Sequence, residues 1–171
     1  MILDTCCVTT PLSTLPLPSG DVELRRAELA DLPAIVGLLA NDPLGSSRET
    51  EAEEADLQPY RDAFRAVDDD PAQLLVVVTA VRDVVGTMQL SFIPGLARRG
   101  ALRAQIEAVR VGEHYRSQGL GRAMFEWAIA EARRRGCALV QLTTDKARTD
   151  AHRFYDRLGF INSHEGLKLE L

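Results

Sequence analysis

The sequence has few cysteines, no long apolar run and no spacing typical of metal ligands. Its three cysteines are an odd and small number, and none belongs to a metal-binding pattern. Cys137 opens an apolar run, which indicates a small core residue rather than a nucleophile. No apolar stretch approaches the ~20 residues that span a bilayer. The sequence therefore predicts neither a metal site nor a membrane partner.

The first twenty residues lack a basic leading segment and an uninterrupted apolar core. They make a poor secretory signal, so a cytoplasmic location is the default expectation. They mix Pro, Ser and Thr without a period, which predicts a flexible leader over residues 1–20. Residues 21–171 are long enough for a single domain with its own core. The net charge of -5 argues against a general nucleic-acid or anionic-membrane binder.

Strands and helices alternate along this domain in an α/β pattern. A β-branched run at 74–80 predicts a buried strand, and strict alternation at 84–93 predicts an antiparallel one. Apolar residues at helical spacing predict helices after Asp31 and from Thr149. The remaining predicted elements are strands at 22–25, 101–111 and 137–144, helices at 58–67 and 120–135, and a closing hairpin of 160–162 with 167–171.

The strand at 101–111 changes its alternation part-way. Arg103, Gln105 and Glu107 share one parity, yet Val109 continues that row as an apolar residue. One extra residue in the strand produces such a switch, so we expect a β-bulge near 108–110. A bulge interrupts pairing and leaves main-chain groups free for a ligand.

The stretch 116–121 joins this strand to the long helix. Gly119 and Gly121 remove Cβ where the backbone turns, so an outside group can approach the main chain closely. The first N–H groups of a helix lack internal partners and favour negative charge. The joint therefore predicts a phosphate site. The strand that follows the helix indicates a right-handed parallel crossover.

Two common phosphate-binding motifs do not fit this joint. A Walker loop needs a Gly-Lys-Ser/Thr run, and the sequence has none. A dinucleotide fold would use Gly119-Leu120-Gly121 with Asp145 as the ribose acid. However, Met124 fills the position that needs a small residue, and the motif comes late in the chain.

The run from Arg116 to Gly121 resembles the Arg/Gln-x-x-Gly-x-Gly/Ala signature of the GNAT superfamily of acyl-CoA-dependent N-acyltransferases. The run from Phe154 to Phe160 is similar to the late FYxxLGF segment of that family. The resemblance extends from about Val22 to the C-terminus. It implies a mixed, mostly antiparallel sheet flanked by helices, with a central parallel β-α-β crossover and splayed strands.

The resemblance also implies that acetyl-CoA is the acyl donor. Its pyrophosphate would meet backbone N–H groups of the joint, and its pantetheine arm would lie along the bulged strand. A backbone N–H of Val109 or Val111 would polarise the thioester carbonyl. Arg116 would add charge at the phosphates; the alternatives are an exposed loop residue or a cap on a carbonyl. The residues assigned to the donor are Val109, Val111, Arg116, Gln118, Gly119, Leu120, Gly121, Arg122 and Ala123.

Acyl transfer to an amine needs a base for the ammonium and benefits from an acid for the thiolate. Glu107, on the cofactor-bearing strand, is the candidate base, directly or through water. Its alternative is an ion pair with Arg103 or Arg110. The resemblance assigns Tyr155 as the acid, and its alternative is a core aromatic. Arg148 stands where many members carry Asn, so the family's cofactor contact at this position does not carry over, and Arg148 or Lys146 is expected to meet phosphates instead.

The function expected is N-acetylation of a primary amine of a small molecule or peptide. The alternatives are a CoA-binding sensor or interaction module without turnover and transfer of a longer acyl group. The acidic segment 49–56 is either a solvated face or the lining of a site for a cationic acceptor. A homodimer is a common assembly in the family.

Overall fold

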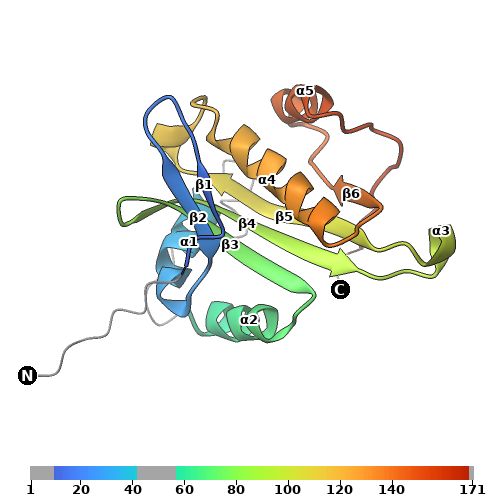
Figure 1. Ribbon diagram of the computed structural model, residues 1–171, viewed down its shortest axis with the longest axis horizontal. Helices are drawn as coiled ribbons and strands as arrows, with labels where there is room; N and C mark the ends of the chain where they lie inside the picture. The colour runs from blue at the N-terminus through green and yellow to red at the C-terminus, as the bar shows by residue number, and fades with distance from the viewer. Residues whose placement is uncertain (1–9, 42–56, 170–171) are drawn as a thin grey trace, which may run out of the picture.

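The computed structural model describes residues 10–41 and 57–169, which form a mixed α/β fold on a six-stranded sheet. The strands lie side by side in chain order, and all neighbours are antiparallel except β5 and β6, which are parallel (Figure 1). The elements are β1 (Ser13–Leu15), β2 (Val22–Arg26), α1 (Leu32–Ala40), α2 (Gln58–Asp69), β3 (Gln73–Ala80), β4 (Asp83–Ile93), the short α3 (Ala97–Gly100), β5 (Arg103–Val111), α4 (Leu120–Arg134), β6 (Leu139–Leu142) and α5 (Thr149–Arg157).

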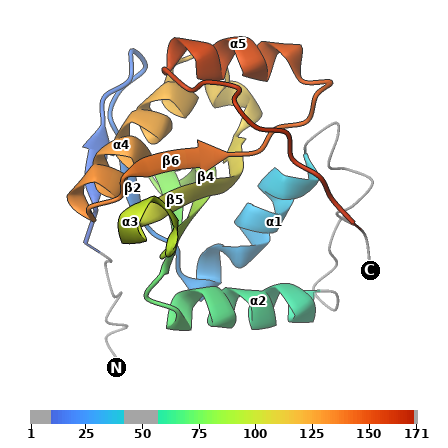
Figure 2. The ribbon, with the colours of Figure 1, turned by 90° about the vertical axis from the view of Figure 1, so that its right-hand side faces the viewer.

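Different helices cover the two faces of the sheet (Figure 2). In β3, Val76 and Val78 pack into the core under α4, whereas Val77 packs against α1 and α2. Neighbouring side chains of a strand alternate between faces, so an unbroken apolar run fills both layers. All three valines are fully buried. The side chains that α4 buries on its layer are Leu120, Met124, Phe125, Ala128 and Ala132.

A buried ion pair fixes the entry into α1. Asp31 accepts hydrogen bonds from both terminal nitrogens of Arg25, at 2.7 and 2.8 Å, and one from the Glu28 N–H at 2.7 Å. Burial alone raises the pKa of Asp31, but these hydrogen bonds outweigh it and lower the pKa below its ordinary value. The end of β2 is thereby tied to the first turn of α1, which contains Pro33.

The structure confirms the predicted fold class and most of its elements. The predicted strands at 74–80 and 84–93 are β3 and β4, and the predicted helix at 120–135 is α4. The β-bulge is present, because Glu107 pairs with Gln89 while Arg110 pairs with Thr87. Two residues of β5 thus lie opposite one residue of β4, and Ala108 adopts a φ of 51°.

Two expectations about the chain ends differ from the structure. Part of the predicted flexible leader is ordered, because Ser13–Leu15 pairs with β2 and buries Leu15. The predicted closing hairpin is wrong for the described residues 160–169, which contain no strand. Ile161 and Leu167 are exposed there, and an isolated pair of such short strands is only marginally stable.

Some expectations concern segments that lie outside the described residues. The acidic segment 49–56 and residues 1–9 are among these. In residues 10–41 and 57–169, no helix is both long enough and apolar enough to cross a membrane.

Candidate active site

The joint between β5 and α4 presents a row of backbone N–H groups. Gly119 precedes α4 with a φ of 89°, a left-handed conformation that glycine adopts without strain. Within the described chain, the N–H groups of residues 117–122 donate to no protein acceptor. The start of a helix favours negative charge, so this row can hold an anion.

The other groups predicted at the joint have structural roles. The Ala123 N–H donates to the Gly119 carbonyl at 3.0 Å, so this amide is already used within the helix. Leu120 is fully buried in the core. The Gln118 side chain donates to the His114 carbonyl on the exposed side of the loop. The N–H groups that remain available run from Ser117 to Arg122.

A cavity of about 490 Å³ opens in front of this row. It lies between the end of β5, the joint and the helix α5. Its lining combines exposed amides and guanidinium groups with an apolar wall, which suits a ligand with both a phosphate and an apolar part. The lining residues are Val111, Tyr115, Arg116, Ser117, Gly119, Gly121, Arg122, Phe154, Arg157 and Leu158.

Three arginines border this cavity, and two of them have partners among the described residues. Arg116 donates to the Val111 carbonyl at 3.2 Å and to the Asn41 carbonyl at 3.4 Å. It therefore caps carbonyl groups, which the sequence analysis gave as an alternative to a phosphate contact. Arg122 forms an ion pair with Glu126 at 2.7 Å on the exposed side of α4. Arg157, from α5, lines the cavity as well. Sequence analysis missed Arg157, although it lies one helical turn after Phe154 and so faces the same way.

The strands β5 and β6 pair over only part of their length. Residues 103–106 pair in parallel with residues 139–142, and β6 ends there. The amides of Gln105 and Gln141 meet at 2.6 Å near this end. Beyond Ile106, no described strand lies on this side of β5. Residues 107–111 therefore have no strand partner on the edge that faces the cavity, although the Val109 and Val111 carbonyls accept from the side chains of Arg110 and Arg116.

Tyr155 lies on α5 in a cluster of aromatic rings. Its ring meets Phe125, Phe154 and Phe160 edge to face, at centroid distances of 5.5, 5.4 and 6.0 Å. Burial raises the pKa of Tyr155 above its ordinary value, against opposing effects from Arg148, a hydrogen bond with Thr144 and Arg110. The hydroxyl therefore keeps its proton at neutral pH, as a proton donor must.

Glu107 lies on β5 directly before the bulge. Its side chain is exposed, and its cross-strand neighbour is Gln89. Among residues 10–41 and 57–169, Glu107 has no ion-pair partner, so the alternative pair with Arg103 or Arg110 is not formed. The carboxylate is accessible where the strands separate.

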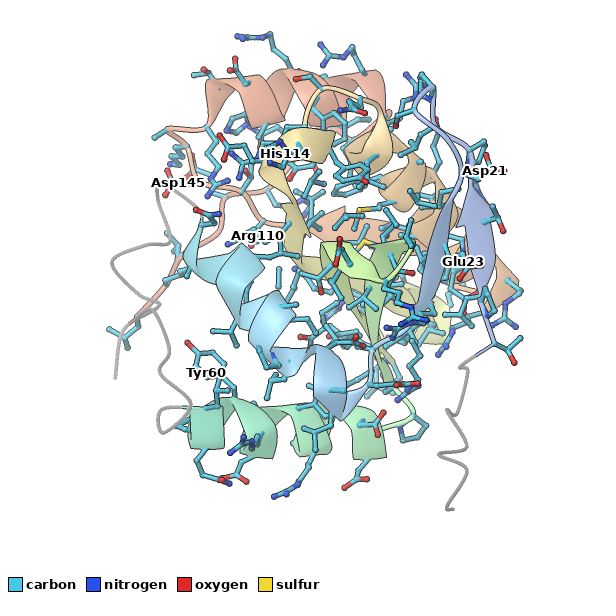
Figure 3. The ribbon with its side chains drawn as sticks, turned by 90° about the vertical axis from the view of Figure 1, so that its left-hand side faces the viewer. Asp21, Glu23, Tyr60, Arg110, His114 and Asp145 are labelled. Atoms are coloured by element: carbon cyan, nitrogen blue, oxygen red, sulfur yellow. The ribbon has the colours of Figure 1, made fainter. Side chains whose placement is uncertain are left out.

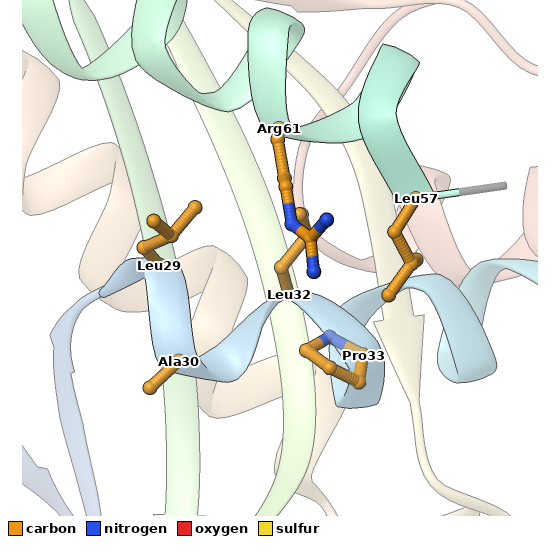
Figure 4. Close-up of a pocket in the computed structure, with 6 residues that line it drawn as sticks. All are labelled: Leu29, Ala30, Leu32, Pro33, Leu57 and Arg61. Atoms are coloured by element: carbon orange, nitrogen blue, oxygen red, sulfur yellow. The ribbon is translucent and has the colours of Figure 1, made fainter. Parts of the chain in front are cut away.

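A second cavity lies on the other side of the sheet. It measures about 330 Å³, and Arg61 reaches into it from α2 toward α1 (Figure 4). It shares no lining residue with the first cavity, and none of its lining residues belongs to β5 or β6. Its lining is Leu29, Ala30, Leu32, Pro33, Leu57 and Arg61.

Cys137 takes no part in either cavity. It is half-buried against the core under α4, and burial raises the pKa of its thiol. A thiol that stays protonated is a weak nucleophile, in agreement with a packing role.

Comparison with known proteins agrees with this geometry. The acetyltransferase (GNAT) family matches residues 38–160. Aminoalkylphosphonate N-acetyltransferase of Salmonella typhimurium is 32% identical over 142 residues, covering 83% of this chain and 86% of that protein. The chain belongs to the GNAT acetyltransferase family.

Solved structures share the whole fold. A transcriptional regulator from Bacillus halodurans is 44% identical with a TM-score of 0.84, covering 88% of this chain and 99% of that one. An acetyltransferase from Trypanosoma brucei is 27% identical with a TM-score of 0.71, covering 88% of this chain and 100% of that one.

Membership in the GNAT family makes the chain an acyl-CoA-dependent acetyltransferase. The family uses acetyl-CoA, and the features at the β5–α4 joint fit that molecule. The unpaired N–H row faces a cavity with room for a diphosphate, and the open edge of β5 continues from it.

Proposed function

We propose that this enzyme transfers an acetyl group from acetyl-CoA directly to a primary amine of a small molecule or peptide. The observation that carries the proposal is the separation of β5 from β6 beside the unpaired N–H row. Direct transfer needs donor and acceptor in one open site, and the separation supplies it. The Salmonella relative named above acts on a small amine, which supports a small-molecule acceptor.

The N–H groups of Gln118, Gly119, Leu120, Gly121 and Arg122 hold the donor diphosphate in this proposal. The exposed edge at Val109 and Val111 supports the pantetheine arm and donates an N–H to the thioester carbonyl. When bound, the thioester supplies the acetyl group and a thiolate leaving group. Arg116 positions the loop through its carbonyl contacts rather than through the phosphates.

Glu107 and Tyr155 divide the proton transfers. Glu107 is the base that takes a proton from the incoming ammonium, because its carboxylate is exposed beside the open edge. The amine nitrogen then bonds to the acetyl carbon, and the carbon–sulfur bond breaks. Tyr155 is the acid that donates its proton to the departing sulfur, since its raised pKa keeps the hydroxyl protonated.

A thiol-release assay with a panel of primary amines tests this function. Wild-type protein should release CoA with at least one amine, and mass spectrometry should show the matching N-acetyl product. Tyr155→Phe should lower kcat at unchanged KM for acetyl-CoA. Release of CoA at equal rates with and without every amine would contradict the proposal.

The second candidate is a CoA-binding sensor without turnover. It is favoured by the name of the Bacillus halodurans structure, which is a transcriptional regulator of the same fold. Calorimetry separates the two candidates. A sensor binds acetyl-CoA but releases no CoA with any amine, whereas an enzyme does both.

A further inference from the structure

The second cavity, between the starts of α1 and α2, has the lining of a small-molecule site. Two of its lining side chains, Leu32 and Leu57, are buried, whereas Leu29 and Pro33 lie exposed at its rim. Its volume of about 330 Å³ has room for about ten non-hydrogen atoms, if each takes the volume of one liquid water molecule. Ligand cavities are typically apolar in this way, with a small number of polar groups that orient the ligand.

The polar group of this cavity is the side chain of Arg61. Arg61 follows Leu57 by four residues and precedes Phe64 by three, so it lies on the same stripe of α2 as these two buried residues. Tyr60, next to it in sequence, packs into the apolar layer between α1 and α2 (Figure 3). The guanidinium of Arg61 extends from α2 toward the start of α1 (Figure 4). The stripe that builds the apolar layer therefore also carries a charge into the cavity.

Arg61 has no counter-charge among the residues that the structure describes. It forms neither an ion pair nor a hydrogen bond with any of them. Two carboxylates adjoin the lining residues in sequence, and both are engaged elsewhere. Asp31 accepts from both terminal nitrogens of Arg25, and Asp62 accepts from Arg65 at 3.3 Å. The lining therefore presents one positive charge that no described carboxylate pairs with.

We propose that this cavity is a second binding site, for a small carboxylate with a branched aliphatic or aromatic body. A guanidinium donates two parallel hydrogen bonds to a carboxylate and neutralises its single charge. A phosphate monoester would bring further negative charge that no other lining residue meets. The apolar body contacts the leucines of the lining. The site is separate from the cavity at the β5–α4 joint, because the two share no lining residue.

Backbone-amide NMR titration of the full chain, saturated with CoA, tests the site. The probes are phenylacetate, 4-methylpentanoate, phenylacetamide, which keeps the aromatic body without charge, and acetate, which keeps the charge without the body. We expect the better of the two larger carboxylates to bind at least about tenfold more tightly than phenylacetamide or acetate, because hydrogen bonds to charged groups are the stronger ones. Shifts should concentrate at residues 29–33 and 57–61. Equal affinity for phenylacetamide, no saturable binding of either larger carboxylate, or shifts confined to residues 109–122 would overturn the proposal.

Arg61→Gln tests the residue itself. The variant should weaken binding of the preferred carboxylate at least about tenfold and leave binding of phenylacetamide unchanged. Arg65→Gln is the matched control, because Arg65 is an exposed arginine one turn later on α2 and does not line the cavity. Wild-type affinity in Arg61→Gln, or an equal loss in both variants, would overturn the assignment. Thermal melting of both variants shows whether a loss reflects unfolding.

A titration without CoA keeps this site distinct from the one proposed for the acyl donor. The Kd for the preferred carboxylate should be the same with and without CoA. A Kd that rises with the CoA concentration would show that the carboxylate uses the other cavity, and would overturn the proposal. Turnover enters neither measurement, so a protein that releases no CoA with any amine can still bind the carboxylate at Arg61, and an active enzyme can lack this site.

Discussion

Alanine at Gly121 should stabilise the protein and weaken its binding of acetyl-CoA. Gly121 is the second residue of α4 and has no positive φ. An added Cβ would lie 3.8 Å from Cγ2 of Val111 and 4.0 Å from Cζ of Phe154, which are ordinary contacts. These two residues and Gly121 line the same cavity, so the new methyl group extends into the space assigned to the diphosphate.

Gly121→Ala should raise the stability of the protein and lower its affinity for CoA, and each change can be estimated by itself. A glycine replaced by alanine at a compatible helical position gains about 0.4–1 kcal/mol, mainly because the unfolded chain loses freedom. The methyl group prevents a phosphate oxygen from reaching hydrogen-bond distance of the nearby N–H groups. We expect Kd for CoA to rise at least about tenfold, which is about 1.4 kcal/mol.

Two other glycines serve as comparisons. Gly37, inside α1, would place a Cβ in open space and has no positive φ, so Gly37→Ala should gain similar stability and bind CoA normally. Gly119 has a φ of 89°, so Gly119→Ala should lose about 1 kcal/mol from backbone strain. Urea unfolding and calorimetry with CoA measure both quantities. Wild-type CoA affinity in Gly121→Ala would refute the placement of the diphosphate.

Three further changes probe other parts of the molecule. Tyr155→Phe should lower kcat about 100-fold. The difference between the absorbance titrations of wild type and this variant should show the Tyr155 hydroxyl ionising above pH 10, because its pKa is raised. Asp31→Asn should cost about 3 kcal/mol at pH 7 in urea unfolding, since it breaks a nearly buried pair with Arg25. The pKa of Asp31 is lowered on folding, so this difference should be full above its unfolded pKa and shrink as the pH falls below about 4. Val81→Asn should raise the melting temperature, gaining about 1 kcal/mol, because Val81 is fully exposed at a φ of 59°.

Each of these expectations has a clear contrary result. Wild-type kcat in Tyr155→Phe would remove the tyrosine from the chemistry. A constant difference between Asp31→Asn and wild type from pH 7 to pH 3 would contradict the lowered pKa of Asp31. A lower melting temperature for Val81→Asn would show that the exposed valine has a contact that its position does not reveal.

The central part of the fold could be predicted because its patterns are local. The sequence runs of β3 and β4 contain unbroken or alternating apolar residues, and few secondary structures other than a strand fit these patterns. The bulge was visible as a change of parity between Glu107 and Val109. The glycines at 119 and 121 marked the start of α4 to the residue.

The chain ends could not be predicted in the same way, because their structure depends on distant partners. β1 has three residues and exists through its pairing with β2. β6 is shorter than the predicted strand, since pairing with β5 stops at Leu142 although the β-branched Thr143 and Thr144 follow. Arg157 and the approach of Arg110 to Tyr155 depend on how α5 docks, which no local pattern encodes.

The single extra residue in β5 also constrains how this protein can change over evolutionary time. Removing Ala108 would restore a regular strand and turn Val109 and Val111 outward. The guanidinium of Arg110 would then point into the apolar core beneath α4. Side chains at the open end of this strand can be exchanged one by one to suit a new acceptor. The number of residues between Ile106 and Gly112 cannot change without losing the fold.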